Sequence, residues 1–246
     1  MPHFFKDEIK GENFEITGED ARHIIKSLRM KKGEKLTVCD KDQMEYLCEI
    51  TDFEREKVSL HILNKNICKT EPLINVTLFQ ALPKGDKMDF IVQKSAEIGV
   101  FEIVPIVTAR CISRPDDKAI SKKLIRWNKI AKEAAEQSGR GMIPKVLHLK
   151  GFNKILSLLN DFDQTFVFYE KGGLSLHKTL SSKSKNVAII IGPEGGFEED
   201  EIKQLEERKV IVSTLGNRIL RAETAPLVAL SNLIFLKENY PDLNFI

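Results

Sequence analysis

Two glycine-containing segments carry the residue types most suited to binding a ligand. Residues 192–196 (Gly-Pro-Glu-Gly-Gly) follow the apolar run 187–191, and residues 217–226, which include Arg221 and Glu223, follow the apolar run 210–212. Each segment also precedes a helical pattern. A glycine turn after one strand is usually plain structure, but two such turns in one parallel sheet form a crevice at its carboxyl edge. Glycine lets a ligand approach the backbone closely, so we expect a binding site there.

Several common catalytic motifs are absent from the chain. There is no Gly-x-Gly-x-x-Gly after the first strand of the α/β part, which disfavours a standard dinucleotide site. Walker-type phosphate loops, His-Glu-x-x-His and Gly-x-Ser-x-Gly are also missing, so nucleotide hydrolysis, zinc proteolysis and serine hydrolysis lack their usual residues. The five histidines and four cysteines are too widely spaced for a metal site, and none is expected.

Composition indicates a globular protein with an uneven charge distribution. The chain has 246 residues, 42% hydrophobic and 30% charged, with a net charge of +2. Residues 22–35 hold six Lys and Arg against one acid, and residues 110–150 hold eleven against four. Such patches favour a polyanionic partner, although charges on helix faces also serve solvation. No apolar run is long enough for a membrane span, and unpaired cysteines without a leader sequence favour a cytoplasmic protein.

The pattern of apolar residues divides the chain into two domains. Residues 1–71 predict a small, mainly β domain with strands at 35–39, 44–50 and 57–62 and one helix, in which Arg22, Lys26 and Arg29 share an outer face. Residues 72–246 alternate strands and helices, which predicts an α/β domain with a parallel sheet. The expected strands are 74–81, 102–107, 145–149, 164–169, 187–191 and 210–213, and the expected helices are 86–98, 121–138, 152–160, 174–180, 198–207 and 224–238.

The last predicted helix is apolar on nearly every side over residues 227–236. A helix of this kind is buried all round, either within its own domain or against another chain. Because helices of an α/β domain lie in a surface layer, the second option predicts a homodimer.

Four ordered segments resemble a known family: 82–87 (Leu-Pro-Lys-Gly-Asp-Lys), 133–140 (Glu-Ala-Ala-Glu-Gln-Ser-Gly-Arg), 191–196 and 215–225. They are similar to the bacterial 16S ribosomal RNA uracil-N3 methyltransferases of the knotted SPOUT superfamily. The N-terminal domain resembles that family's PUA-like β-barrel. The resemblance spans essentially the whole chain and implies a trefoil-knotted α/β domain, bound S-adenosyl-L-methionine and a homodimer.

The resemblance also assigns residues to the cofactor. Three loops would bind S-adenosylmethionine, with glycines close to the ligand and aliphatic side chains against the adenine, although core packing explains those aliphatics equally well. The expected cofactor residues are Phe168, Tyr169, Glu170, Ile191, Gly192, Gly195, Gly196, Leu215, Gly216, Ile219 and Leu220.

Methyl transfer to uracil N3 needs the removal of a weakly acidic proton. The proton lies roughly two pKa units above neutral pH, a deficit of ~2.7 kcal/mol that charge and base catalysis can supply. Arg221 is expected to stabilise negative charge on the uracil carbonyls, and either Glu223 or Glu136 to accept the proton. The alternative for Arg221 is a structural salt bridge with Glu223.

The expected RNA partner is 16S ribosomal RNA within the small ribosomal subunit. Candidate contact residues are Arg22, His23, Lys26, Arg29, Lys84, Arg110, Gln137 and Arg140. Two alternatives remain open: a SPOUT enzyme that modifies transfer RNA ribose or guanine, and an RNA-binding or ribosome-assembly protein without catalysis. The N-terminal basic residues and the 133–140 segment weigh against the first alternative, and the intact glycine loops with Arg221 and Glu223 weigh against the second.

Overall fold

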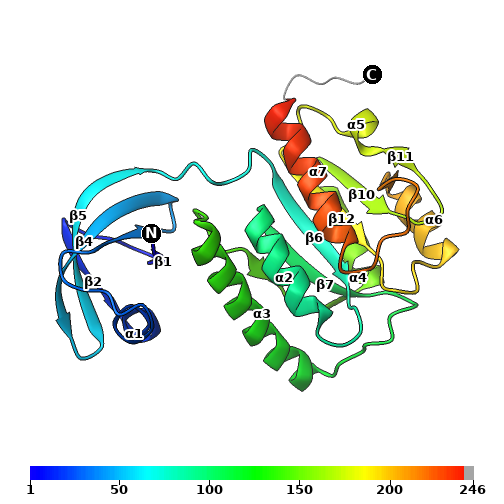
Figure 1. Cartoon of the computed structure of the whole chain (residues 1–246). Helices are drawn as coiled ribbons and strands as arrows, with labels where there is room; N and C mark the ends of the chain where they lie inside the picture. Colours follow the sequence, from blue (N-terminus) through cyan, green and yellow to red (C-terminus); the bar gives the residue numbers. More distant parts are fainter. Residues whose placement is uncertain (241–246) are drawn as a thin grey trace. The chain divides into compact units, whose positions relative to one another are not determined.

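The computed structural model describes residues 1–240, which form two compact units (Figure 1). The first unit comprises Met1–Glu71 and Ala135–Ile143, and the second comprises Pro72–Ala134 and, among the described residues, 144–240. The sequence predicts a domain boundary between residues 71 and 72, and nothing in its pattern assigns residues 135–143 to the first unit. No helix of the described residues is long and apolar enough to cross a membrane.

The first unit is a five-stranded sheet with a short helical segment. Its strands pair in the order β1-β3-β4-β5-β2, with β1 parallel to β3 and the other pairs antiparallel. Alternate side chains such as Leu36, Val38, Ile50 and Leu60 are fully buried and form its core with Ile24 of the helical segment. The elements are β1 (His3–Phe5), β2 (Asn13–Thr17), α1 (Gly18–Arg22), β3 (Lys35–Cys39), β4 (Met44–Glu54) and β5 (Lys57–Ile67).

The helical segment differs from the single α-helix that the sequence predicts. After α1 the chain forms a π-helix over His23–Ser27, closed by the Leu28 N–H donating to the His23 carbonyl at 3.0 Å. Arg29 then adopts a left-handed conformation with φ of 53°. The wider π turn changes the helical phase, so Arg22, Lys26 and Arg29 do not follow one α-helical face. All three side chains are nevertheless exposed.

The second unit is an α/β domain around a wholly parallel sheet, as the alternating pattern predicts. Its strand order is β11-β13-β10-β12-β6-β7-β8, with β9 also paired to β7. The strands are β6 (Asn75–Ala81), β7 (Glu102–Val107), β8 (Lys145–Val146), β9 (Lys150–Gly151), β10 (Gln164–Phe168), β11 (Leu174–Ser175), β12 (Asn186–Ile191) and β13 (Ile211–Thr214). The helices are α2 (Lys87–Ile98), α3 (Asp117–Ser138), α4 (Phe152–Leu156), α5 (Leu176–Thr179), α6 (Glu199–Glu207) and α7 (Ala225–Asn239).

Helices cover both faces of this sheet, because its central strands are apolar on both sides. In β12, Ile189 packs into one core with Trp127 of α3 and Leu230 of α7, whereas Ile190 packs into a second core with Leu205 of α6. Figure 1 shows α2, α3 and α7 on one side of the sheet and α4 and α6 on the other.

The parallel arrangement brings five loops to one edge of the sheet. The strands β13, β10, β12, β6 and β7 are consecutive neighbours, so the loops that follow them leave from the same carboxyl edge. This edge is where the sequence predicts a crevice. The trefoil knot that the family resemblance implies stays a prediction, since strand order and pairing do not define how the chain is threaded.

Candidate functional site

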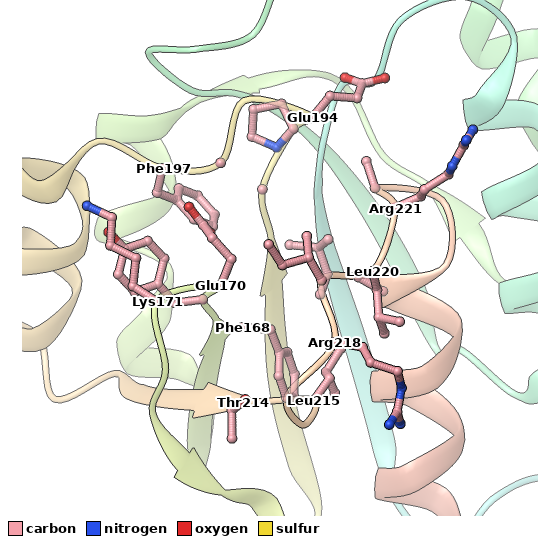
Figure 2. Close-up of a pocket in the computed structure, with 18 of the residues that line it drawn as sticks. Phe168, Glu170, Lys171, Glu194, Phe197, Thr214, Leu215, Arg218, Leu220 and Arg221 are labelled. Carbon is pink, nitrogen blue, oxygen red and sulfur yellow. The ribbon is translucent and has the colours of Figure 1, made fainter.

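A pocket of about 730 Å³ opens at this edge, within the usual size range of small-molecule sites (Figure 2). Three loops form most of its wall: residues 168–172 after β10, residues 192–197 after β12, here called the glycine loop, and residues 215–222 after β13, here called the arginine loop. All eleven residues that the sequence assigns to a cofactor line it. Its other lining residues are Lys87, Lys171, Gly172, Pro193, Glu194, Phe197, Thr214, Asn217, Arg218, Arg221, Ala222 and Ala225.

The glycine loop passes close to its neighbours, and Gly196 has a backbone conformation that L side chains rarely adopt. Gly196 has φ of 69°, and a Cβ there would lie 2.5 Å from Glu170 Oε1. A Cβ at Gly192 would lie 3.0 Å from the ring of Phe197, which is buried below the loop. The glycines therefore keep the backbone of this wall accessible from the pocket, as a ligand that binds backbone groups requires.

Arg110, from the loop after β7, holds the glycine loop on one side. Its guanidinium donates to the Gly195 carbonyl at 2.9 Å and to both carboxylate oxygens of Glu198 at 2.8 and 2.9 Å. Hydrogen bonding from Arg110 lowers the pKa of Glu198. Glu198 also begins α6 in a capping box with Glu201, so this bidentate pair fixes the junction between loop and helix.

Lys87, the first residue of α2, holds the glycine loop on the other side. Its ammonium lies 3.1 Å from Glu194 Oε1 and 3.0 Å from Glu223 Oε2. The Lys84 N–H donates to the same Glu194 oxygen at 3.1 Å. Burial acts to raise the pKa of Glu194 and of Glu223, but hydrogen bonds from backbone N–H groups and from Lys87 outweigh it, and both pKa values are lowered.

The arginine loop is more open than the glycine loop. Gly216 has φ of 102°, and a Cβ there would meet nothing within 4 Å. Ile219 is 83% exposed. Arg218 and Arg221 are exposed as well, and in Figure 2 the side chain of Arg221 extends upward from the loop and that of Arg218 downward.

The three proposed catalytic residues lie in different surroundings. Arg221 lines the pocket. Glu223 does not line it, and its carboxylate lies 3.0 Å from the ammonium of Lys87. Arg221 makes no direct salt bridge with Glu223, although its charge helps to lower the pKa of Glu223. Glu136 is half-buried, belongs to the first unit and is not among the pocket residues, so its role as a base stays a prediction.

The structure corrects the expectation for one RNA-contact candidate. Arg140 is only 3% exposed, and its guanidinium pairs with Glu71 through Nε at 3.2 Å and Nη2 at 2.5 Å. Glu71 also accepts the Gly141 N–H at 2.8 Å, so Arg140 stabilises the first unit and is not presented to RNA. Arg110 is committed to the glycine loop as described above. The remaining candidates are exposed: Arg22, His23, Lys26, Arg29, Lys84 and Gln137.

Lys87 and Glu194 are two charged pocket residues that the sequence does not assign to the site. Both stand in segments that carry the family resemblance, but each is one charged residue among several, and only the fold brings them together. The described residues contain no group of three or more His, Cys, Asp or Glu side chains that could hold a metal ion.

Comparison with known proteins connects this geometry to a family. The family model of the RNA methyltransferase domain matches residues 69–234, and the family model of the RNA methyltransferase PUA domain matches residues 16–63. The chain is 40% identical over 232 residues to ribosomal RNA small subunit methyltransferase E of Bacillus subtilis (strain 168), covering 92% of this chain and 91% of the relative. The identity to the protein of the same name from Mesomycoplasma hyopneumoniae (strain 232) is 33%, covering 95% and 99%.

A solved structure extends the similarity to the whole fold. The crystal structure of a ribosomal RNA small subunit methyltransferase E from Neisseria gonorrhoeae, bound to S-adenosyl methionine, superposes with a TM-score of 0.87. It shares 31% sequence identity, and the match covers 98% of both chains.

Proposed function

The chain belongs to the ribosomal RNA small subunit methyltransferase E family, and we propose that it methylates N3 of a specific uridine in the 16S ribosomal RNA of the small subunit, using S-adenosyl-L-methionine. The observation that carries this proposal is the pocket formed by the three strand-end loops. Its lining contains every residue that the resemblance assigns to the cofactor, and a relative of the same fold binds S-adenosyl methionine.

The residues of the pocket suit this ligand. Phe168, Leu215 and Leu220 supply apolar surface for the adenine ring, and Figure 2 shows them around the lower and central part of the pocket. The glycine loop offers backbone groups that no side chain of Gly192, Gly195 or Gly196 covers, because glycine has none. These features fit a ligand with one flat apolar end and several polar groups.

The bound cofactor supplies an electrophilic methyl group on its sulfonium. For N3 to accept that methyl, the chain must stabilise the uracil as it loses the N3 proton. Arg221 supplies a positive charge beside the pocket and stabilises the charge that develops on the uracil carbonyls. Glu223 remains ionised at neutral pH because its pKa is lowered, so it is able to accept a proton but is a weak base. The proton acceptor is Glu223 or Glu136. We expect charge stabilisation by Arg221 to contribute more to the rate of methyl transfer than either carboxylate does.

The exposed apolar side chains support a homodimer. Phe235 of α7 is 53% exposed and Ile219 of the arginine loop is 83% exposed. A second copy that covers α7 would bury such side chains and complete the open side of the arginine loop. The first unit, with exposed Arg22, Lys26 and Arg29, supplies the contacts to ribosomal RNA in the cytoplasm.

The test is a transfer assay with radiolabelled S-adenosylmethionine and small subunits that lack the modification, followed by nucleoside analysis. We expect label in 3-methyluridine. Label in a ribose-methylated or guanine-methylated nucleoside would favour another SPOUT reaction. Cofactor binding without any transfer to subunits or naked 16S RNA would favour a non-catalytic assembly protein.

A further inference from the structure

The two walls of the pocket are joined through a single ammonium group. Lys87 Nζ contacts Glu194 of the glycine loop and Glu223, which directly follows the arginine loop, at 3.1 and 3.0 Å. The two carboxylate oxygens therefore lie no more than about 6 Å apart, a separation at which unscreened like charges repel. Without a cation between them, the two segments would be pushed apart.

Local stability does not explain a lysine at this position. Lys87 is the first residue of α2, and a cation at a helix N-terminus opposes the helix dipole. The dipole and the Lys84 N–H instead favour the Glu194 carboxylate. Asp89, further along α2, is already engaged by Arg126 and by the indole of Trp127. The partners of Lys87 are thus the two pocket segments and not its own helix.

We propose that Lys87 is a positioning residue of the methyl-transfer site, which holds the glycine loop and the arginine loop at the separation that S-adenosylmethionine needs. The inference rests on the proposed function, because it concerns how that cofactor is bound. Two charged groups face the pair of carboxylates: Lys87, and Arg221, which lies near Glu223. The backbone N–H of Lys84 also donates a hydrogen bond to Glu194.

The test measures cofactor affinity by calorimetry on the full chain between pH 5.5 and pH 8. Lys87→Met keeps the aliphatic stem and removes the charge, so we expect a 10- to 100-fold weaker affinity at pH 8. As pH falls, one of the two unscreened carboxyls should protonate and bond to the other, so the affinity of Lys87→Met should return toward the wild-type value. Lys87→Arg retains the charge and should stay within threefold of wild type.

A double variant separates repulsion from general damage. Lys87→Met/Glu223→Gln removes one of the two facing charges, so it should bind the cofactor more tightly than Lys87→Met at pH 8 and lose the pH dependence. Lys87→Met with unchanged affinity, or with a loss that neither low pH nor Glu223→Gln relieves, would overturn the role of Lys87. Wild-type protein that fails to bind S-adenosylmethionine would instead overturn the proposed function.

Discussion

The glycine loop and the arginine loop border the same pocket but are fixed to very different degrees. Arg110 and Lys87 hold the glycine loop from two sides, at the Gly195 carbonyl and the Glu194 carboxylate. The arginine loop has open space around Gly216 and an almost fully exposed Ile219. Segments with few buried contacts are the ones that reorder on binding. We infer that the glycine loop is preorganised for the cofactor, and that the arginine loop is completed by ligand, RNA or a second chain.

The largest expected effect on cofactor affinity comes from substituting Gly196 of the glycine loop, and Gly216 of the arginine loop provides the comparison. Gly196→Val should weaken cofactor binding at least about 100-fold, because a β-branched residue is strained at positive φ and its Cβ would displace Glu170. Gly216→Ala has a similar backbone constraint but no neighbour within 4 Å, so it should weaken binding only about tenfold or less. Calorimetry with S-adenosylmethionine measures both. Equal losses of cofactor affinity in the two variants would contradict the inference that the glycine loop is rigid and the arginine loop is open.

Substitution of Arg221 should lower the turnover rate and leave the cofactor affinity nearly unchanged. If it stabilises charge that exists only in the transition state, Arg221→Ala should lower kcat about 10²- to 10³-fold, while the cofactor Kd changes little. Arg218→Ala is the matched control, because Arg218 is an exposed arginine of the same loop whose side chain extends in another direction in Figure 2. Single-turnover rates and calorimetry separate the two quantities. A parallel loss of affinity and rate in Arg221→Ala would make it a cofactor-binding residue.

Substitution of Arg110 should weaken cofactor binding more than RNA binding. Arg110→Met removes the bonds to Gly195 and Glu198, so we expect about a tenfold increase in cofactor Kd from a loosened glycine loop. Lys203→Met, which removes an exposed ion pair with Asp200 on α6, should change nothing measurable. The original expectation of RNA contact by Arg110 predicts the opposite result: an unchanged cofactor Kd and a reduced salt dependence of RNA binding.

Local sequence patterns account for the features that could be predicted from the sequence. Most strands and helices of the second unit follow from apolar runs and periodicity, but the two-residue strands β9 and β11 lie where the sequence predicts no strand. The pocket follows from glycines placed after strands of one parallel sheet. These are local patterns with a single structural solution. The eleven residues that the family resemblance assigns to the cofactor all line the pocket, and their contact with the cofactor stays a prediction.

The pairing of charges could not be predicted, because it depends on contacts between distant segments. Arg140 is 69 residues from Glu71 in the sequence, and Lys87 is more than 100 residues from Glu194 and Glu223. Each charged side chain has many partners of suitable type, and only the tertiary fold selects one. The π-helix after α1 is missed for another reason, since its residues are also compatible with an ordinary α-helix.

The smallest expected effect on the isolated cofactor site is that of Ile219→Ser. Because Ile219 is 83% exposed, its replacement should change the free energy of unfolding of one chain by no more than about 0.5 kcal/mol. Cofactor affinity should fall only slightly, since Phe168, Leu215 and Leu220 remain to line the pocket. If a second chain or RNA covers the arginine loop, the variant should instead weaken dimerisation or raise KM for small subunits.

Analytical ultracentrifugation and substrate titration distinguish those two coverings of Ile219. A shift toward monomer with unchanged KM per dimer would identify a second copy as the covering surface, whereas an unchanged dimer with a raised KM would identify RNA. Phe235→Ser, on the exposed side of α7, is the matched comparison, because it removes an apolar side chain outside the pocket lining. It should affect dimerisation alone. An Ile219→Ser variant that matches wild type in both measurements would show that the arginine loop needs no covering, and the contrast between the two walls would then concern cofactor binding only.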